Sequence, residues 1–132
     1  MKAKLVVVID DDPDDVEMLK YIFKKADSRI QCLAFLCPVE AIKKLSDENS
    51  PVPDCVFIDI NMPVLNGSEC LEELRKVKRF QHVPMIMLST TVSDRIDNDL
   101  KLKGATLAFQ KPFKLSGYYQ ILMDIPIMNH RH

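Results

Sequence analysis

Glycine is scarce in this sequence of 132 residues, which contains only Gly67, Gly104 and Gly117. No two of them lie close together. A P-loop needs two glycines five residues apart before Lys-Ser/Thr, and a dinucleotide-binding fold needs G-x-G-x-x-G. Neither motif can be written with these residues, so the sequence argues against a conventional ATP, GTP or NAD site.

Long apolar runs and an excess of basic residues are also missing. The longest apolar run, Leu5–Ile9, is far too short to cross a bilayer, and no cationic leader with a long apolar run opens the sequence. We therefore expect no membrane span and no secretory signal. Lys and Arg number 18 and Asp and Glu 19, a formal net charge of −1. Because nucleic-acid-binding domains normally carry a basic excess, we expect no direct nucleic-acid binding.

The four cysteines show no C-x-x-C pair and do not group with the histidines. Cys32, Cys55 and Cys70 lie within apolar or amphipathic runs, and Cys37 is the fourth. Metal-ligand spacing is absent. We therefore interpret the cysteines as small core side chains of a reduced, cytoplasmic protein rather than as zinc ligands or disulfide partners.

The apolar runs that are present alternate five times with amphipathic stretches. Runs such as LVVVI are apolar at every position, a pattern typical of a strand covered on both faces in a parallel sheet. The expected strands are Leu5–Ile9, Ile30–Leu36, Cys55–Ile60, Met85–Leu88 and Thr106–Phe109. With 132 residues and 47% apolar content, the chain is the usual size for one soluble domain.

The stretches between the strands predict helices. Asp12 and Pro13 have the residue types of an N-cap and a first helical position. The helices are expected after Asp12, after Pro38, after Gly67, from about Ser93 to Lys103, and from about Leu115 to Ile125. With right-handed crossovers, the (βα)5 order predicts an α/β fold, a doubly wound five-stranded parallel sheet with helices on both faces. We expect one domain over residues 1–126 and a short tail over 127–132.

Polar residues follow the expected strands at their C-terminal ends, where open α/β sheets bind ligands. These residues are Asp10, Asp11, Asp59, Asn61, Ser89 and Lys111. Two carboxylates about 4 Å apart repel by up to ~4 kcal/mol, so such a group needs a cation or raised pKa values. Oxygen ligands of this kind suit Mg²⁺ or Mn²⁺. By contrast, Asp12, Asp14 and Asp15 are interpreted as helix-cap and dipole residues rather than ligands.

Four separated motifs carry a family resemblance: DDDPDD after VVVI, FIDINMPVLNG around Asp59, MIMLSTT, and KGATLAFQKPF. In this order, and over essentially the whole chain, they resemble the receiver domain of two-component response regulators. The resemblance implies the flavodoxin-like strand order 2-1-3-4-5. It also implies that Asp59 is the phosphoacceptor.

The resemblance assigns the remaining site residues by position. Asp10, Asp11 and Asp59 resemble the carboxylates that hold Mg²⁺ (or Mn²⁺), with the backbone carbonyl of Asn61 as a further ligand. Ser89 and Lys111 resemble the hydroxyl and the ammonium that meet the phosphoryl group. Asn61 and Thr91 occupy the positions that tune dephosphorylation in the family.

The function that the resemblance implies is a stand-alone, Mg²⁺-dependent phosphorylation switch in the cytoplasm. It would take its phosphoryl group from a histidine kinase or histidine phosphotransfer protein and change its binding to a downstream protein partner. One alternative is a Mg²⁺-dependent aspartyl-phosphate hydrolase, which usually has a second Asp where this sequence has Asn61. Another is a scaffold that leaves its phosphate chemistry unused, against which Asp10, Asp11, Asp59 and Lys111 argue.

Two further expectations concern the end of the last strand. Ala108 stands where the family usually has an aromatic residue that turns inward on activation, so we expect the signal to leave this domain without that rotation. Strand alternation points the neighbouring Phe109 to the other face. By resemblance, the peptide bond between Lys111 and Pro112 is expected to be cis.

Overall fold

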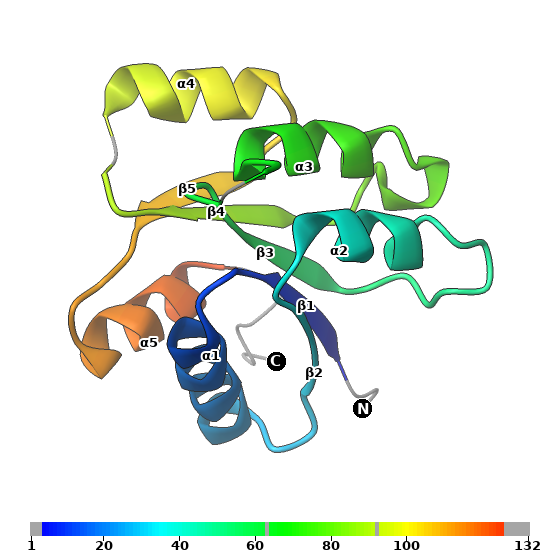
Figure 1. The fold of residues 1–132 in the computed structure, drawn as a ribbon. Coiled ribbons are helices and arrows are strands. Elements are labelled where there is room, and N and C mark those ends of the chain that lie inside the picture. Colours follow the sequence, from blue (N-terminus) through cyan, green and yellow to red (C-terminus); the bar gives the residue numbers. More distant parts are fainter. Residues whose placement is uncertain (1–3, 63, 92, 126–132) are drawn as a thin grey trace.

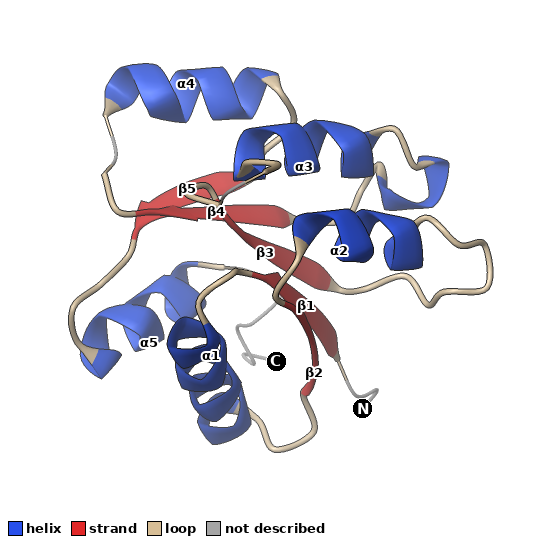
Figure 2. Cartoon of the chain, in the orientation of Figure 1, coloured by secondary structure: helices blue, strands red, loops and turns tan. Residues whose placement is uncertain are grey.

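The computed structural model describes residues 4–62, 64–91 and 93–125. Pro126 and the expected tail over 127–132 lie outside the described residues. Within them, strands and helices alternate along the chain (Figures 1 and 2). The strands are β1 (Leu5–Ile9), β2 (Gln31–Phe35), β3 (Cys55–Asp59), β4 (Met85–Ser89) and β5 (Leu107–Gln110). The α-helices are α1 (Pro13–Ala26), α2 (Pro38–Leu45), α3 (Gly67–Arg75), α4 (Asp94–Leu102) and α5 (Leu115–Asp124).

The five strands form one parallel sheet in the order β2-β1-β3-β4-β5. Figure 1 shows α1 and α5 on one face of this sheet and α2, α3 and α4 on the other. Two apolar cores follow from this arrangement, one on each face. The fold class and the strand order expected from the sequence are both confirmed.

The burial of the strands explains their composition. Every residue of β3 and β4 is buried, as are four of the five residues of β1, because helices cover the inner strands on both faces. Side chains still alternate between the two cores: Val6 and Val8 pack with α1 and α5, whereas Val7 and Ile9 pack on the opposite side. The edge strands β2 and β5 are only partly buried.

The helices differ in how firmly they are attached. The side chain of Asp12 caps α1 by accepting a hydrogen bond from the backbone N–H of Asp14 at 3.0 Å, and Pro13 follows as expected. In α4, Leu100 is the one buried residue, and Leu102 is 88% exposed. A pocket of about 950 Å³ lies beside α4. This helix therefore buries less apolar surface against the sheet than its counterparts do.

The sequence did not reveal the short 3₁₀ helix η1 (Lys78–Phe80), which precedes β4. Phe80 in this turn is fully buried. The guanidinium of Arg79, in the same turn, donates hydrogen bonds to three backbone carbonyls at the end of α2 and in the segment that follows it, those of Leu45, Asp47 and Ser50. Tertiary contacts of this kind, rather than a local sequence pattern, hold the turn in place.

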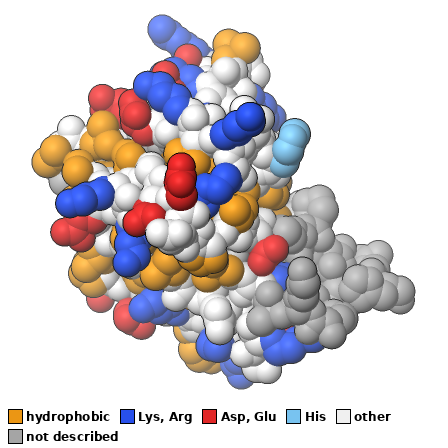
Figure 3. Space-filling view, turned by 90° about the vertical axis from the view of Figure 1, so that its right-hand side faces the viewer, with side chains coloured by type: hydrophobic (Ala, Val, Ile, Leu, Met, Phe, Trp, Pro, Cys, Tyr) orange, Lys and Arg blue, Asp and Glu red, His pale blue; other side chains and the backbone are white. Residues whose placement is uncertain are grey.

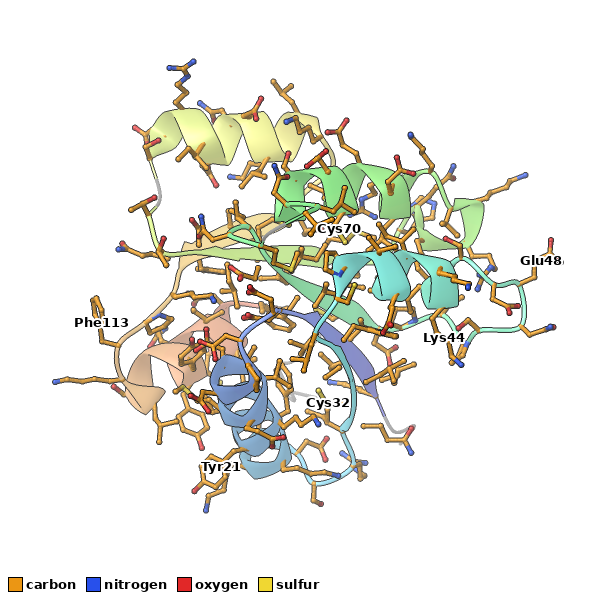
Figure 4. The ribbon with its side chains drawn as sticks, viewed as in Figure 1. Tyr21, Cys32, Lys44, Glu48, Cys70 and Phe113 are labelled. Carbon is orange, nitrogen blue, oxygen red and sulfur yellow. The ribbon has the colours of Figure 1, made fainter. Side chains whose placement is uncertain are left out.

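The cysteines are all free thiols. Burial raises the pKa of Cys55 and Cys70 to about 12, and that of Cys32 to about 11. Figure 4 labels Cys70, which belongs to α3, and Cys32, which belongs to β2. The interpretation of Cys55 and Cys70 as core side chains is confirmed, whereas Cys32 and Cys37 are only partly buried.

The apolar content of the helices and the charges on the surface also bear on the expectations from the sequence. No helix of the described segments has both the length and the apolar composition needed to cross a membrane. On the face turned to the viewer in Figure 3, Lys and Arg side chains are interspersed with Asp and Glu.

Gly67 fixes the start of α3 against the end of β3. Its backbone N–H donates to the carbonyl of Ile60 at 3.0 Å. A Cβ at this position would lie 2.3 Å from the carbonyl oxygen of Asp59 and 2.6 Å from the Cα of Ile60. Both of these are backbone atoms, so neither can move aside as a flexible side chain would.

We therefore predict that Gly67→Ala lowers the free energy of unfolding by about 1–3 kcal/mol, the usual cost of forcing an extra carbon into a packed site. This is opposite in sign to the usual effect of Gly→Ala in a helix, which stabilises it by up to ~1 kcal/mol. Urea unfolding is the measurement. Glu72→Ala, an exposed change on the same helix, is the control and is expected to stay within ~0.5 kcal/mol. A stabilised Gly67→Ala variant would contradict the prediction.

Candidate functional site

The polar residues that the sequence placed at the strand ends come together at one edge of the sheet. Asp10 directly follows β1, Asp59 and Ser89 end β3 and β4, and Lys111 follows β5. Asp10, Asp59 and Ser89 are at most 3% exposed, and they are the buried polar or charged residues among those that the structure describes. Burying such groups is costly unless they are paired, so their partners decide what the site does.

The ammonium of Lys111 is the common partner of three carboxylates. Its Nζ lies 2.7 Å from Oδ2 of Asp15, 3.1 Å from Oδ2 of Asp10 and 3.4 Å from Oδ1 of Asp59. Burial by itself lowers the pKa of Lys111, but the hydrogen bond to Asp15 and the charges of Asp10 and Asp59 outweigh it, and the pKa lies above its ordinary value. Lys111 is therefore charged throughout the physiological range.

Backbone groups orient the two buried carboxylates. Oδ1 of Asp10 accepts from the N–H of Asp12 at 2.9 Å, and Oδ1 of Asp59 accepts from the N–H of Asn61 at 3.1 Å. Burial nevertheless raises the pKa of both acids. For Asp59, burial and then the charge of Asp10 raise the pKa to about 6. Because three carboxylates surround the single ammonium of Lys111, the site also holds more negative charge than Lys111 alone offsets.

The three carboxylates of Asp10, Asp11 and Asp59 fit a divalent cation. Each offers an oxygen, and these oxygens lie within 4.8 Å of one another. Asp11 is exposed, and a pocket of about 480 Å³ opens beside it, lined by Asp59, Asn61 and Lys111 among others. Hard oxygen donors with room for water are the donor set that Mg²⁺ and Mn²⁺ prefer.

The amide of Asn61 organises the polar residues after β4. Its Oδ1 accepts hydrogen bonds from the hydroxyl of Ser89 at 3.3 Å and from both the N–H and the hydroxyl of Thr90 at 3.2 Å. The Ser89 hydroxyl in turn accepts from the N–H of Thr91 at 3.2 Å. Ser89 and Asn61 are therefore part of one network that borders Asp59.

Sequence reasoning missed two residues of this site. Thr90 lines the pocket and donates a hydrogen bond to Asn61. In the sequence, the one feature that could have indicated this role was its place directly after Ser89, at the end of β4. Asp15 was interpreted as a helix-dipole residue, and it makes the shortest contact with Lys111. Asp12, by contrast, serves as the expected cap.

The expected cis bond before Pro112 is wrong, because the described residues contain no cis peptide bond. A trans X-Pro bond is favoured by about 0.5–1 kcal/mol, and Lys111 reaches all three of its carboxylate partners with that geometry. Phe113, the last residue of the KPF sequence, is 99% exposed and points away from the molecule (Figure 4).

The alternation expected in β5 is confirmed. Ala108 packs against the core beneath α2, α3 and α4, whereas Phe109 packs against the core beneath α1 and α5. The methyl group of Ala108 thus faces the side of the sheet that α4 covers. The expectation that the signal leaves without an aromatic rotation stays a prediction.

Comparisons with known proteins agree with this geometry. A family model described as the response regulator receiver domain matches residues 6–122. The transcriptional regulatory protein CpxR homolog of Haemophilus influenzae is 33% identical over 109 residues, which cover 82% of this chain and 44% of that protein. The chain spans about half the length, or less, of the curated relatives that it matches first.

Solved structures are similar over nearly the whole chain. The chemotaxis response regulator CheY4 of Vibrio cholerae is 25% identical with a TM-score of 0.80, covering 94% of this chain and 98% of its own. A chain of the CheX-CheY-BeF3-Mg²⁺ complex from Borrelia burgdorferi is 27% identical with a TM-score of 0.75, covering 92% of this chain and 87% of its own. With the family model matching most of the sequence, this chain belongs to the response regulator receiver domain family.

Proposed function

We propose that this chain is a cytoplasmic phosphorylation switch in which Asp59 accepts a phosphoryl group from a histidine kinase or histidine phosphotransfer protein. Phosphorylation of Asp59 then alters the binding of a downstream protein partner. The observation that carries the proposal is the carboxylate of Asp59, buried at a strand end, lining an open pocket and lying 3.4 Å from the ammonium of Lys111. Membership in the receiver family supports the same role.

The chemistry begins with the deprotonated carboxylate of Asp59. One of its oxygens attacks the phosphorus of the phosphohistidine, and the P–N bond breaks. The leaving imidazole keeps the bonding electron pair and is protonated from water. Lys111 provides positive charge where the phosphoryl oxygens gather negative charge, and the Ser89 hydroxyl supplies a hydrogen-bond donor. Hydrolysis later reverses the change, as water attacks the acyl phosphate and releases inorganic phosphate.

The fit of the acidic residues supports Mg²⁺ dependence. Asp10, Asp11 and Asp59 would hold Mg²⁺ (or Mn²⁺), with the backbone carbonyl of Asn61 as a further ligand. When bound, the ion supplies positive charge that offsets the repulsion among the carboxylates and neutralises phosphoryl oxygens. The side chain of Asn61, which holds Ser89 and Thr90, and the neighbouring Thr91 would tune the rate of hydrolysis.

The first prediction of the proposed function concerns the phosphorylated residue. Incubation with acetyl phosphate and Mg²⁺ is expected to add one phosphoryl group, which hydroxylamine removes because an acyl phosphate is the product. Asp59→Asn is expected to abolish the addition, whereas Asp14→Asn, an exposed acid of α1, is expected to retain it. Intact-protein mass spectrometry is the measurement. Full labelling of Asp59→Asn would show that another residue accepts the phosphoryl group.

The second prediction concerns the cation. Because Mg²⁺ binds the folded chain, it is expected to raise the melting temperature, with a stabilisation of about 2.7 kcal/mol at a hundred times its Kd. Asp11→Ala removes a proposed ligand that is itself exposed, so the rise is expected to disappear. Asp14→Ala serves as the matched control and keeps the rise. If Asp11→Ala retains the full rise in thermal unfolding, the assigned ligands are wrong.

The third prediction concerns the metal-free protein. The folded pKa of Asp59 is about 6, whereas an unfolded Asp titrates near 3.9. The folded state therefore binds this proton more tightly, and the resulting stability is present below about pH 4 and is lost as the pH rises through about 6. The full contribution is on the order of 3 kcal/mol.

Asp59→Asn is expected to remove this decrease in the free energy of unfolding. The variant therefore gains stability relative to the parent chain between pH 4 and 7. Urea unfolding across that range, with a chelator present, measures the difference. Parallel pH profiles for the two proteins would contradict the prediction.

A further inference from the structure

We propose that Asp15 restrains Lys111 in the unphosphorylated protein and releases it when the phosphoryl group arrives. In this role Asp15 is a positioning residue that sets how readily Asp59 is phosphorylated. The inference rests on the proposed function. It concerns a residue outside the three carboxylates that fit a cation.

The contacts of Lys111 rank its three partners. The distance to Asp15 is 2.7 Å, against 3.1 Å to Asp10 and 3.4 Å to Asp59. The side chains of Lys111 and Asp15 are only 15% and 22% exposed, so water screens their attraction weakly. In the unphosphorylated protein, the ammonium is thus held most closely by an acid that takes no part in the attack on phosphorus.

The acceptors around Lys111 compete for a small number of N–H donors. An ammonium has three N–H donors, and three carboxylates lie within ion-pair distance of it. A phosphoryl group on Asp59 would compete with Asp10 and Asp15 for this ammonium, because Lys111 donates its hydrogen bonds to those two acids and lies only at ion-pair distance from Asp59. Asp10 and Asp59 are each also held by a backbone N–H, and both belong to the group that a cation would neutralise.

Asp15 is therefore the partner that yields. Its carboxylate is the most exposed of the three, so water can hydrate it once Lys111 turns away. Without Asp15, the backbone of Lys111 is still held by its N–H bond to the carbonyl of Ser89 at 2.7 Å, and the ammonium keeps its contacts with Asp10 and Asp59. Removing the charge of Asp15 then weakens its hold on the ammonium and takes a negative charge away from the pocket that an incoming phosphate anion would enter.

The test compares two variants on adjacent positions of α1. Asp15→Asn removes the restraining charge, and Asp14→Asn makes the same change on an exposed side chain of the same helical turn. The rate constant for phosphorylation by acetyl phosphate, at fixed Mg²⁺ and ionic strength, is expected to rise severalfold in Asp15→Asn and to stay within about twofold of the parent in Asp14→Asn. In a Lys111→Met background, Asp15→Asn is expected to have no effect, because coupled residues are not additive.

A second measurement needs no phosphorylation and no metal. In NMR spectra of the metal-free protein, the side-chain ε resonances of Lys111 are expected to shift in Asp15→Asn and to keep their positions in Asp14→Asn. A purely structural role for Asp15 would lower the melting temperature without raising the phosphorylation rate.

Several results would overturn the proposal: an Asp15→Asn rate equal to or below that of the parent chain, an equal acceleration in Asp14→Asn, or an undiminished acceleration in the Lys111→Met background. Failure of the proposed function looks different, because the parent chain itself would then take up no phosphoryl group on Asp59.

Discussion

The ion pairing of the Lys111 ammonium is the interaction on which the rest of the site depends. It joins α1, the end of β1 and the end of β3, because its three carboxylate partners come from those elements. Without it, Asp10 and Asp59 would be buried acids facing each other across a low-dielectric edge of the sheet. Breaking a buried ion pair by removing one partner costs about 3–5 kcal/mol. Lys111 therefore stabilises the folded structure, and in the proposed function it also meets the phosphoryl group.

A parallel sheet is what makes this convergence possible. All five strands point the same way, so residues distant in sequence meet at one edge, and Lys111 lies 101 positions from Asp10. The sheet interior is tightly packed and apolar on both faces, which leaves little room for the strand ends to shift. The more weakly buried α4, beside Ala108, is the element best suited to move.

Much of this was predictable from sequence for a physical reason. Fully apolar runs are typical of strands covered on both faces in a parallel sheet, and in such a sheet the polar residues that end those runs lie at the same edge. The Asp15–Lys111 pair and the η1 turn around Phe80 were not predictable, because they depend on side-chain contacts made after the chain folds. The same holds for Thr90, whose partner Asn61 lies 29 residues away. The trans bond before Pro112 shows that resemblance can mislead where local energetics favour the common geometry.

The central claim is that the carboxylate edge holds more negative charge than Lys111 offsets, and that a divalent cation supplies the remainder. The most direct test is an NMR titration of the Asp59 side-chain carboxyl carbon, with and without Mg²⁺. The account predicts a pKa near 6 in the metal-free protein and a value below the ordinary range for Asp once Mg²⁺ is bound. An ordinary pKa near 4 that Mg²⁺ leaves unchanged would contradict it.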